Sequence, residues 1–129
     1  LFSSLDISVL AHATEDENKI TKFILEYFGK SLNSKQVETV KTEGHWKNPI
    51  TRINIILLLF VDEYFGNIMN ALITLYGKEE LDRYLTNNVD MKGSVYFRLD
   101  KQKLCLGKLE LSDNDAVRII FRRKGKFEK

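Results

Sequence analysis

The sequence predicts an α+β domain in which helices pack on one face of a mixed or mostly antiparallel sheet. The predicted elements follow the order strand, helix, strand, strand, two helices and then strands, which is neither a βαβ alternation nor an all-β pattern. The 129 residues fit a single domain, residues 1–129, and a hydrophobic content of 43% suits a folded core. Seven Gly and one Pro leave no room for a long flexible linker.

The chain opens with a predicted strand and helix. Apolar and polar side chains alternate over residues 5–13, which is the pattern of a half-buried strand. Thr14 and Glu17 then match a capping box. In this motif the Thr14 side chain accepts from an early backbone N–H of the helix, and the Glu17 side chain reaches back towards the backbone N–H of Thr14. Apolar residues at spacings of three and four continue to Phe28, and Gly29 is a natural helix stop.

Two strands are predicted next. Residues 37–42 form the first, and the loop over residues 44–49 breaks the pattern. The Ile- and Leu-rich run over residues 52–60 favours a strand that is buried on both faces. A helix is the alternative there, but the β-branched content and the preceding Pro49 favour the strand.

Helices return in the middle of the chain. Residues 61–76 place seven apolar side chains on one face, including Leu75, and Gly77 can end that helix. Residues 79–87 predict a shorter helix, and residues 95–99 alternate as a strand.

The last predicted elements are short. Asp100 is placed to cap one or two helical turns that stop at Gly107. Residues 109–111 begin a strand, residues 112–115 have the composition of a turn, and residues 117–121 alternate as the final strand.

The net charge of +2 conceals an asymmetry along the chain. Residues 1–90 hold 9 Lys or Arg and 13 Asp or Glu, whereas residues 91–129 hold 11 and 5. A basic final third indicates a polarised surface and a polyanionic partner. The alternative is that these cations only solvate an exposed tail.

Several classes of protein are disfavoured by what the sequence lacks. A single cysteine, Cys105, cannot form an intramolecular disulfide. No signal peptide is visible, and the longest apolar run, residues 55–61, is far short of the roughly 20 residues that span a bilayer. We therefore expect a cytoplasmic protein with no membrane association.

Catalytic and cofactor motifs are also missing. The sequence contains no glycine-rich nucleotide-binding motif, and two histidines with one cysteine cannot supply the four ligands of a structural zinc site. Glu15, Asp16 and Glu17 could hold Mg²⁺ or perform acid–base chemistry, but capping of a helix explains the same residues. We expect no catalytic residues, no cofactor and no metal.

The loop over residues 44–50 is the most unusual stretch, since it holds the only Trp and the only Pro. His45 and Trp46 could stack on unpaired bases while Lys47 contacts a phosphate. The alternative is a turn at Asn48-Pro49 with Trp46 folded onto the core.

Cations in the final third are the other candidates for contact with phosphate. If the last strands are neighbours, their outward positions line one face of the sheet with arginine, whose planar fork suits phosphate. A solvated face of alternating polarity is the alternative. The predicted contacts are Arg98, Lys101, Lys103, Lys108, Arg118, Arg122 and Arg123.

Three stretches together resemble a known family. Residues 11–16, residues 44–50, and residues 98–102 followed by Gly107 are similar in order and spacing to an archaeal family of small RNA-binding proteins, described as predicted exosome-associated subunits. The resemblance covers nearly the whole chain. It implies a fold like that of the ribosomal protein L-five class, with RNA binding and no catalysis.

The sequence thus predicts a non-catalytic RNA-binding protein. Binding would follow the shape and backbone of the RNA, and the protein would be accessory to RNA processing or degradation or to ribosome-related complexes. One alternative is a protein-interaction module that docks on a ribonucleoprotein complex. Another is a small enzyme that uses the carboxylates of residues 15–17 with a metal ion. A homodimer stays open, because a free sheet edge could pair with a second copy.

Overall fold

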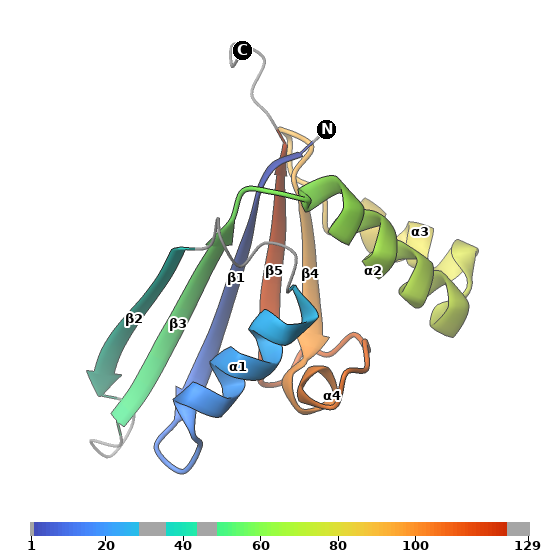
Figure 1. The fold of residues 1–129 in the computed structure, drawn as a ribbon. Helices are drawn as coiled ribbons and strands as arrows, with labels where there is room; N and C mark the ends of the chain where they lie inside the picture. Colours follow the sequence, from blue (N-terminus) through green and yellow to red (C-terminus); the bar gives the residue numbers. More distant parts are fainter. Residues whose placement is uncertain (1, 29–35, 44–48, 124–129) are drawn as a thin grey trace.

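The computed structural model describes residues 2–28, 36–43 and 49–123. This part of the chain forms five strands and four helices (Figure 1). In chain order they are β1 (Phe2–His12), α1 (Glu17–Tyr27), β2 (Gln36–Glu43), β3 (Pro49–Leu57), α2 (Val61–Tyr76), α3 (Lys78–Thr86), β4 (Val95–Asp100), α4 (Lys101–Cys105) and β5 (Ala116–Arg123).

The strands form one sheet in the order β2-β3-β1-β5-β4, and every neighbouring pair is antiparallel. The first and last strands of the chain lie side by side within the sheet (Figure 1). The predicted α+β class is confirmed, and the sheet is antiparallel, not mixed.

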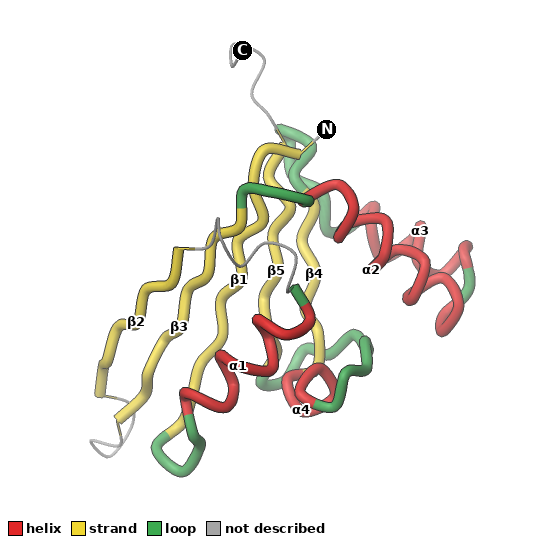
Figure 2. Tube along the Cα trace, viewed as in Figure 1, coloured by secondary structure: helices red, strands yellow, loops and turns green. Residues whose placement is uncertain are grey.

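The hydrophobic core lies between the sheet and the helices. Alternate residues of β1, such as Leu5 and Ile7, are almost fully buried on this face, and α1 lies across the strands in Figure 2. The ring of Phe65 on α2 packs against aromatic side chains of β1 and β5. The centroid of that ring lies 4.8 Å from the Phe2 centroid and 5.1 Å from the Phe121 centroid. These aromatic contacts pack α2 against β1 and β5.

We call the opposite side of the sheet the open face. Its described side chains alternate with the core residues, and each of them is half-buried or exposed. The open face comprises Glu38, Val40 and Thr42 of β2, Ile50, Arg52, Asn54 and Ile56 of β3, Ser4, Asp6, Ser8, Leu10 and His12 of β1, Arg118, Ile120 and Arg122 of β5, and Tyr96 and Arg98 of β4.

The start of α1 differs from the predicted capping box. Asp16, not Thr14, is the N-cap, and its carboxylate accepts from the backbone N–H of Asn18 at 2.9 Å and of Lys19 at 3.3 Å. Glu15 instead accepts from the backbone N–H of His12 at 3.0 Å, so it closes the turn before the helix. The predicted stop at residue 29 lies outside the described residues.

The third strand is shifted and less buried than predicted. It runs over Pro49–Leu57, whereas residues 58–60 form an exposed connection to α2. Burial on both faces was wrong, because only Thr51 and its alternate neighbours are buried and Arg52 is exposed. The register explains the end of the strand, since Leu57 pairs with Leu5, near the start of β1.

The two central helices are confirmed. α2 has the predicted bounds of 61–76, and α3 begins and ends one residue before the predicted 79–87. Gly77 separates them with a φ of 89°, a conformation that favours glycine. Leu75, predicted to face inward, is half exposed. No helix among the described residues is long and apolar enough to cross a membrane.

The final third matches the prediction except at one strand. β4 and β5 are present, as is β2 earlier in the chain, and Asp100 caps α4 by accepting from the backbone N–H of Lys103 at 2.9 Å. The strand predicted over residues 109–111 is reduced to a single bridge between Leu99 and Leu111. Those residues instead cover the outer edge of β4.

The edge of β4 is closed to further strands. Three of its N–H groups donate to groups outside the sheet, so they are satisfied without a strand partner. Tyr96 donates to the Asn88 carbonyl at 2.8 Å, Arg98 to the Tyr84 hydroxyl at 3.1 Å, and Asp100 to the Glu110 carbonyl at 2.7 Å.

Candidate nucleic-acid interface

The register of the sheet sets out the open face in rows. One row crosses all five strands and is entirely polar: Glu38, Asn54, Ser8, Arg118 and Arg98 lie opposite one another in turn. Such a row is a wide polar surface with no helix above it in the described part of the chain. Its positive charge lies at the β5 and β4 end.

Arg98 and Arg118 are the centre of this positive charge. They are direct cross-strand partners on β4 and β5, and both side chains are exposed. Among the described residues neither guanidinium forms an ion pair. Like charges placed directly opposite each other destabilise a sheet. The fold therefore carries an electrostatic cost that a bound anion would relieve.

Arg122 lies on the same face but is partly neutralised. Its Nε donates to the carboxylate of Asp6, on the neighbouring strand. This hydrogen bond raises the pKa of Arg122. Arg122 is half exposed, so its remaining N–H groups are accessible to a second acceptor. It extends the positive area along β5, four residues after Arg118.

Arg52 is a further cation on the open face that sequence reasoning missed. It is exposed on β3, where the register places it between Val40 and Leu10. The prediction of a strand buried on both faces hid it. The alternation of Arg52 and Asn54 with buried Ile53 and Ile55 was the signal that would have found it.

Lys101 corrects the expectation that every predicted cation is on the surface. Its side chain is 1% exposed, and its Nζ donates to the carboxylates of Glu15 at 2.7 Å and Asp115 at 2.8–3.0 Å, and to the Leu10 carbonyl at 3.1 Å. Burial alone would lower the pKa of Lys101, but the hydrogen bonds to Asp115 and Glu15 outweigh burial and raise it. This side chain cannot reach a phosphate.

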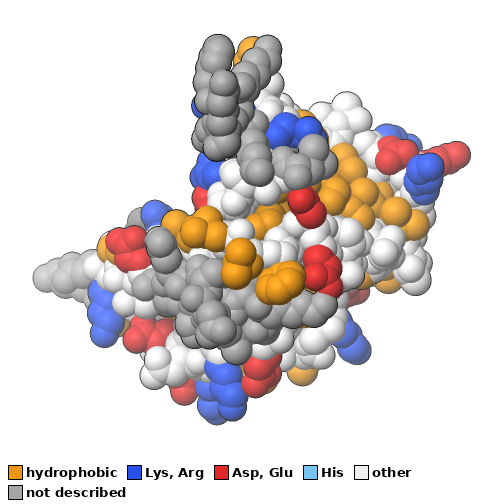
Figure 3. Space-filling view, turned by 45° about the horizontal axis from the view of Figure 1, so that its top comes forward, with side chains coloured by type: hydrophobic (Ala, Val, Ile, Leu, Met, Phe, Trp, Pro, Cys, Tyr) orange, Lys and Arg blue, Asp and Glu red, His pale blue; other side chains and the backbone are white. Residues whose placement is uncertain are grey.

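The other predicted cations lie away from the open face. Lys103 lies on α4, which packs against α1, and it pairs with Glu110 at 3.6 Å. Lys108 lies in the loop after α4 and not on a face of the sheet. Arg123 alternates to the core side of β5, where its guanidinium lies 5.5 Å from the centre of the Phe2 ring. On the helix side, Figure 3 shows positive and negative side chains interspersed.

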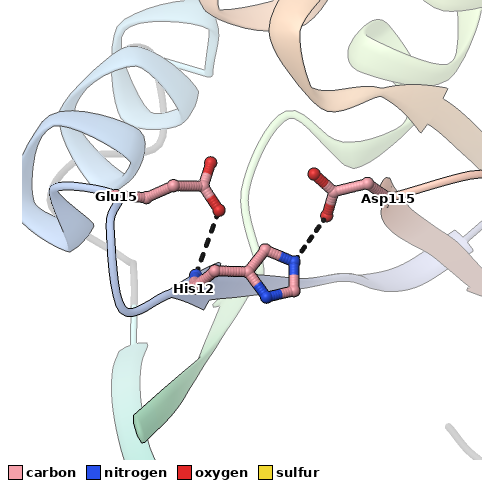
Figure 4. Close-up of side chains that lie close together, drawn as sticks. All are labelled: His12, Glu15 and Asp115. Carbon is pink, nitrogen blue, oxygen red and sulfur yellow. Dashed lines mark hydrogen bonds and ion pairs between the residues drawn. The ribbon is translucent and has the colours of Figure 1, made fainter. Parts of the chain in front are cut away.

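His12, Glu15 and Asp115 form a cluster where β1, α1 and β5 meet (Figure 4). The His12 Nε2 lies 3.3 Å from the Asp115 carboxylate, and one ligand atom of each residue lies within 4.8 Å of the others. The Lys101 ammonium already bonds both carboxylates, so it supplies their positive charge and would repel a metal cation. We interpret the cluster as a structural clamp.

The last predicted sites are the loop over residues 44–50 and the carboxylates of residues 15–17. His45, Trp46 and Lys47 lie outside the described residues, so a stacking role for this loop stays a prediction. The structure does describe the acidic residues at 15–17. Glu15 accepts a hydrogen bond from Lys101, and Asp16 caps α1. Two of these three acidic residues thus have structural partners, which weakens the metal-dependent enzyme alternative.

Comparisons with known proteins give the family of the chain. A family model described as RNA binding matches residues 4–123. RNA-binding protein PAB1135 of Pyrococcus abyssi is 31% identical over 122 residues, which cover 88% of this chain and 76% of that protein. An uncharacterised protein of Methanocaldococcus jannaschii, MJ0213, is 27% identical over 131 residues and covers 96% of this chain, with 86% of its own length matched.

A solved structure shares the fold. Protein SSO0741 of Sulfolobus solfataricus superposes with a TM-score of 0.74 at 28% identity, over 92% of this chain and 86% of that one. With a family match over nearly all of its length, the chain belongs to the archaeal family whose model is described as RNA binding.

Proposed function

We propose that this member of the RNA-binding family binds RNA across the open face of its sheet, with the phosphates contacting Arg98 and Arg118. Arg122 and Arg52 extend the contact along and across the strands. The family description supports RNA as the ligand class. The proposal requires no catalytic residue, metal or cofactor.

The single observation that carries the proposal is the exposed arginine pair. Arg98 and Arg118 face each other on adjacent strands, with no ion pair to a described residue. A guanidinium binds phosphate in a planar, bidentate way. Two guanidinium groups in one row can therefore contact neighbouring phosphates of one RNA strand. Phosphate contacts position a nucleic acid but carry little sequence information, so we propose binding directed mainly by the backbone.

The first test is a salt series on the wild-type protein. Fluorescent single-stranded RNA should bind with an affinity that falls linearly on a log–log plot against salt, because each neutralised phosphate releases counterions. Three to four contacting arginines predict a slope of about −2 to −3 for a single strand. Fluorescence anisotropy measures it, with a DNA duplex as the comparison. An affinity that does not change with salt would contradict phosphate capture.

We also propose a cellular role. The resemblance to exosome-associated subunits supports an accessory part in RNA processing or degradation in the cytoplasm. If two copies pair, β2 is the strand that would join them, because the N–H groups along the β4 edge are occupied. A pull-down that survives nuclease treatment would favour the alternative, a protein-interaction module on a ribonucleoprotein complex.

A further inference from the structure

A hollow of about 400 Å³ lies at the β4 end of the open face, beside the arginine pair. This volume is within the roughly 300–1,000 Å³ typical of small-molecule sites. Arg98 and Arg118 line it on the sheet, Tyr84 and Asn88 come from α3 and the residues after it, and Asp113 comes from the loop before β5. Three separate parts of the chain therefore converge on one concave site.

Tyr96 supplies an aromatic ring that is held in place. Its hydroxyl donates to the Asp90 carboxylate at 2.9 Å. The same carboxylate accepts from the backbone N–H groups of Lys92 and Ser94, both at 2.9 Å. A ring fixed in this way loses little freedom when a base stacks on it, and base–aromatic stacking tolerates any base.

Two polar groups in the hollow are free to meet a ligand. The Tyr84 hydroxyl accepts from the Arg98 N–H at 3.1 Å, but its own proton has no acceptor among the described residues. Asp113 is exposed and forms no ion pair within the described chain, although it lines the same hollow as two arginines. A carboxylate beside a phosphate site is unfavourable unless the ligand also offers a hydrogen-bond donor.

We propose that this hollow seats one unpaired nucleotide of the RNA that the open face binds, a proposal that rests on the function above. The phosphate contacts Arg98 and Arg118, the base stacks on Tyr96, and Asp113 accepts from an exocyclic amino group of the base. An amino group such as N4 of cytosine suits a carboxylate acceptor, whereas O4 of uracil is itself an acceptor. The ligand class is therefore single-stranded RNA whose bases carry an exocyclic amino group, with cytosine as the representative base and uracil as the base that lacks one.

The test compares oligocytidine and oligouridine of equal length, by anisotropy at one salt concentration. The wild-type protein should bind oligocytidine about 10-fold more tightly, as expected for one charged hydrogen bond. Asp113→Asn should reduce this ratio to near one, because an amide can donate to O4 of uracil as well as accept from N4 of cytosine. Asp82→Asn, the same change on the exposed surface of α3, should leave the ratio unchanged.

Equal wild-type affinity for the two oligonucleotides would overturn the nucleotide site and leave the proposed function standing. The site would also fall if Asp113→Asn tightened binding to both by the same factor, because the carboxylate would then only repel phosphate. Absence of binding to either oligonucleotide at low salt would overturn both proposals together.

Discussion

Reversing the charge of Arg98 and Arg118 together is expected to weaken RNA binding about 100-fold, since each guanidinium contributes a charged hydrogen bond to phosphate. The slope of log affinity against log salt should also become shallower by about 1.4, the value for two lost contacts to a single strand. Anisotropy titrations of Arg98→Glu/Arg118→Glu at several salt concentrations measure both effects.

The matched control is Lys103→Glu/Lys108→Glu. It changes the net charge of the chain by the same amount, but both lysines lie outside the open face. Long-range repulsion alone should lower its affinity only a few-fold and leave most of the salt slope. If the two double variants lose affinity equally, net charge governs binding and the open face has no special role.

Stability provides a second readout for the arginine variant. Arg98→Glu/Arg118→Glu keeps two like charges opposite each other on β4 and β5. Its free energy of unfolding should therefore stay within about 0.5 kcal/mol of the wild-type value. A loss of RNA binding in a variant of unchanged stability is then a loss of contacts.

Replacing Lys101 with methionine is expected to lower the free energy of unfolding by about 2 kcal/mol, because the hydrogen bonds of the ammonium are lost and two partly exposed carboxylates are left without their cation. Methionine keeps most of the buried volume, so the effect reports the charge and its three hydrogen bonds. Urea denaturation followed by circular dichroism measures it. Lys103→Met, at a half-exposed neighbour on the same helix, should change stability by less than about 0.5 kcal/mol.

The pH dependence of this variant provides an independent check. Burial raises the pKa of Asp115, but hydrogen bonding to Lys101 outweighs burial, so the pKa lies below its ordinary value of 3.8. The stabilisation is therefore complete above pH 3.8 and is lost as the pH falls through the lowered pKa. The difference between wild type and Lys101→Met should narrow over that range. A difference that stays constant into strong acid would show that Asp115 is not the partner.

The strands were largely predictable because alternation is a local property of the sequence. Residues 5–13 and 117–121 place an apolar side chain at every second position, and they correspond to β1 and β5, which pair within the sheet. The error at residues 52–60 arose because Ile56 and the apolar residues 58–60 hide the alternation. Only pairing with β1 shows where that strand ends.

The site was predictable only in part. Which side chains lie opposite one another on adjacent strands depends on the strand register, and the sequence does not give that register. Arg98, Arg118 and Arg122 follow from alternation alone, but the sequence does not show that Arg98 lies opposite Arg118. Lys101 was placed on the surface because lysine is rarely buried. Its burial depends on Glu15, a partner 86 residues away, which no local pattern reveals.

The most direct test of the central claim is a titration of isotope-labelled isoleucine methyl groups by NMR with single-stranded RNA. Ile56 and Ile120 lie half-buried in one row of the open face, whereas Ile73 is partly buried on α2, on the helix side. We predict that the Ile56 and Ile120 signals shift on addition of RNA while the Ile73 signal stays in place. Shifts of Ile73 with unmoved signals from Ile56 and Ile120 would contradict RNA binding at the open face.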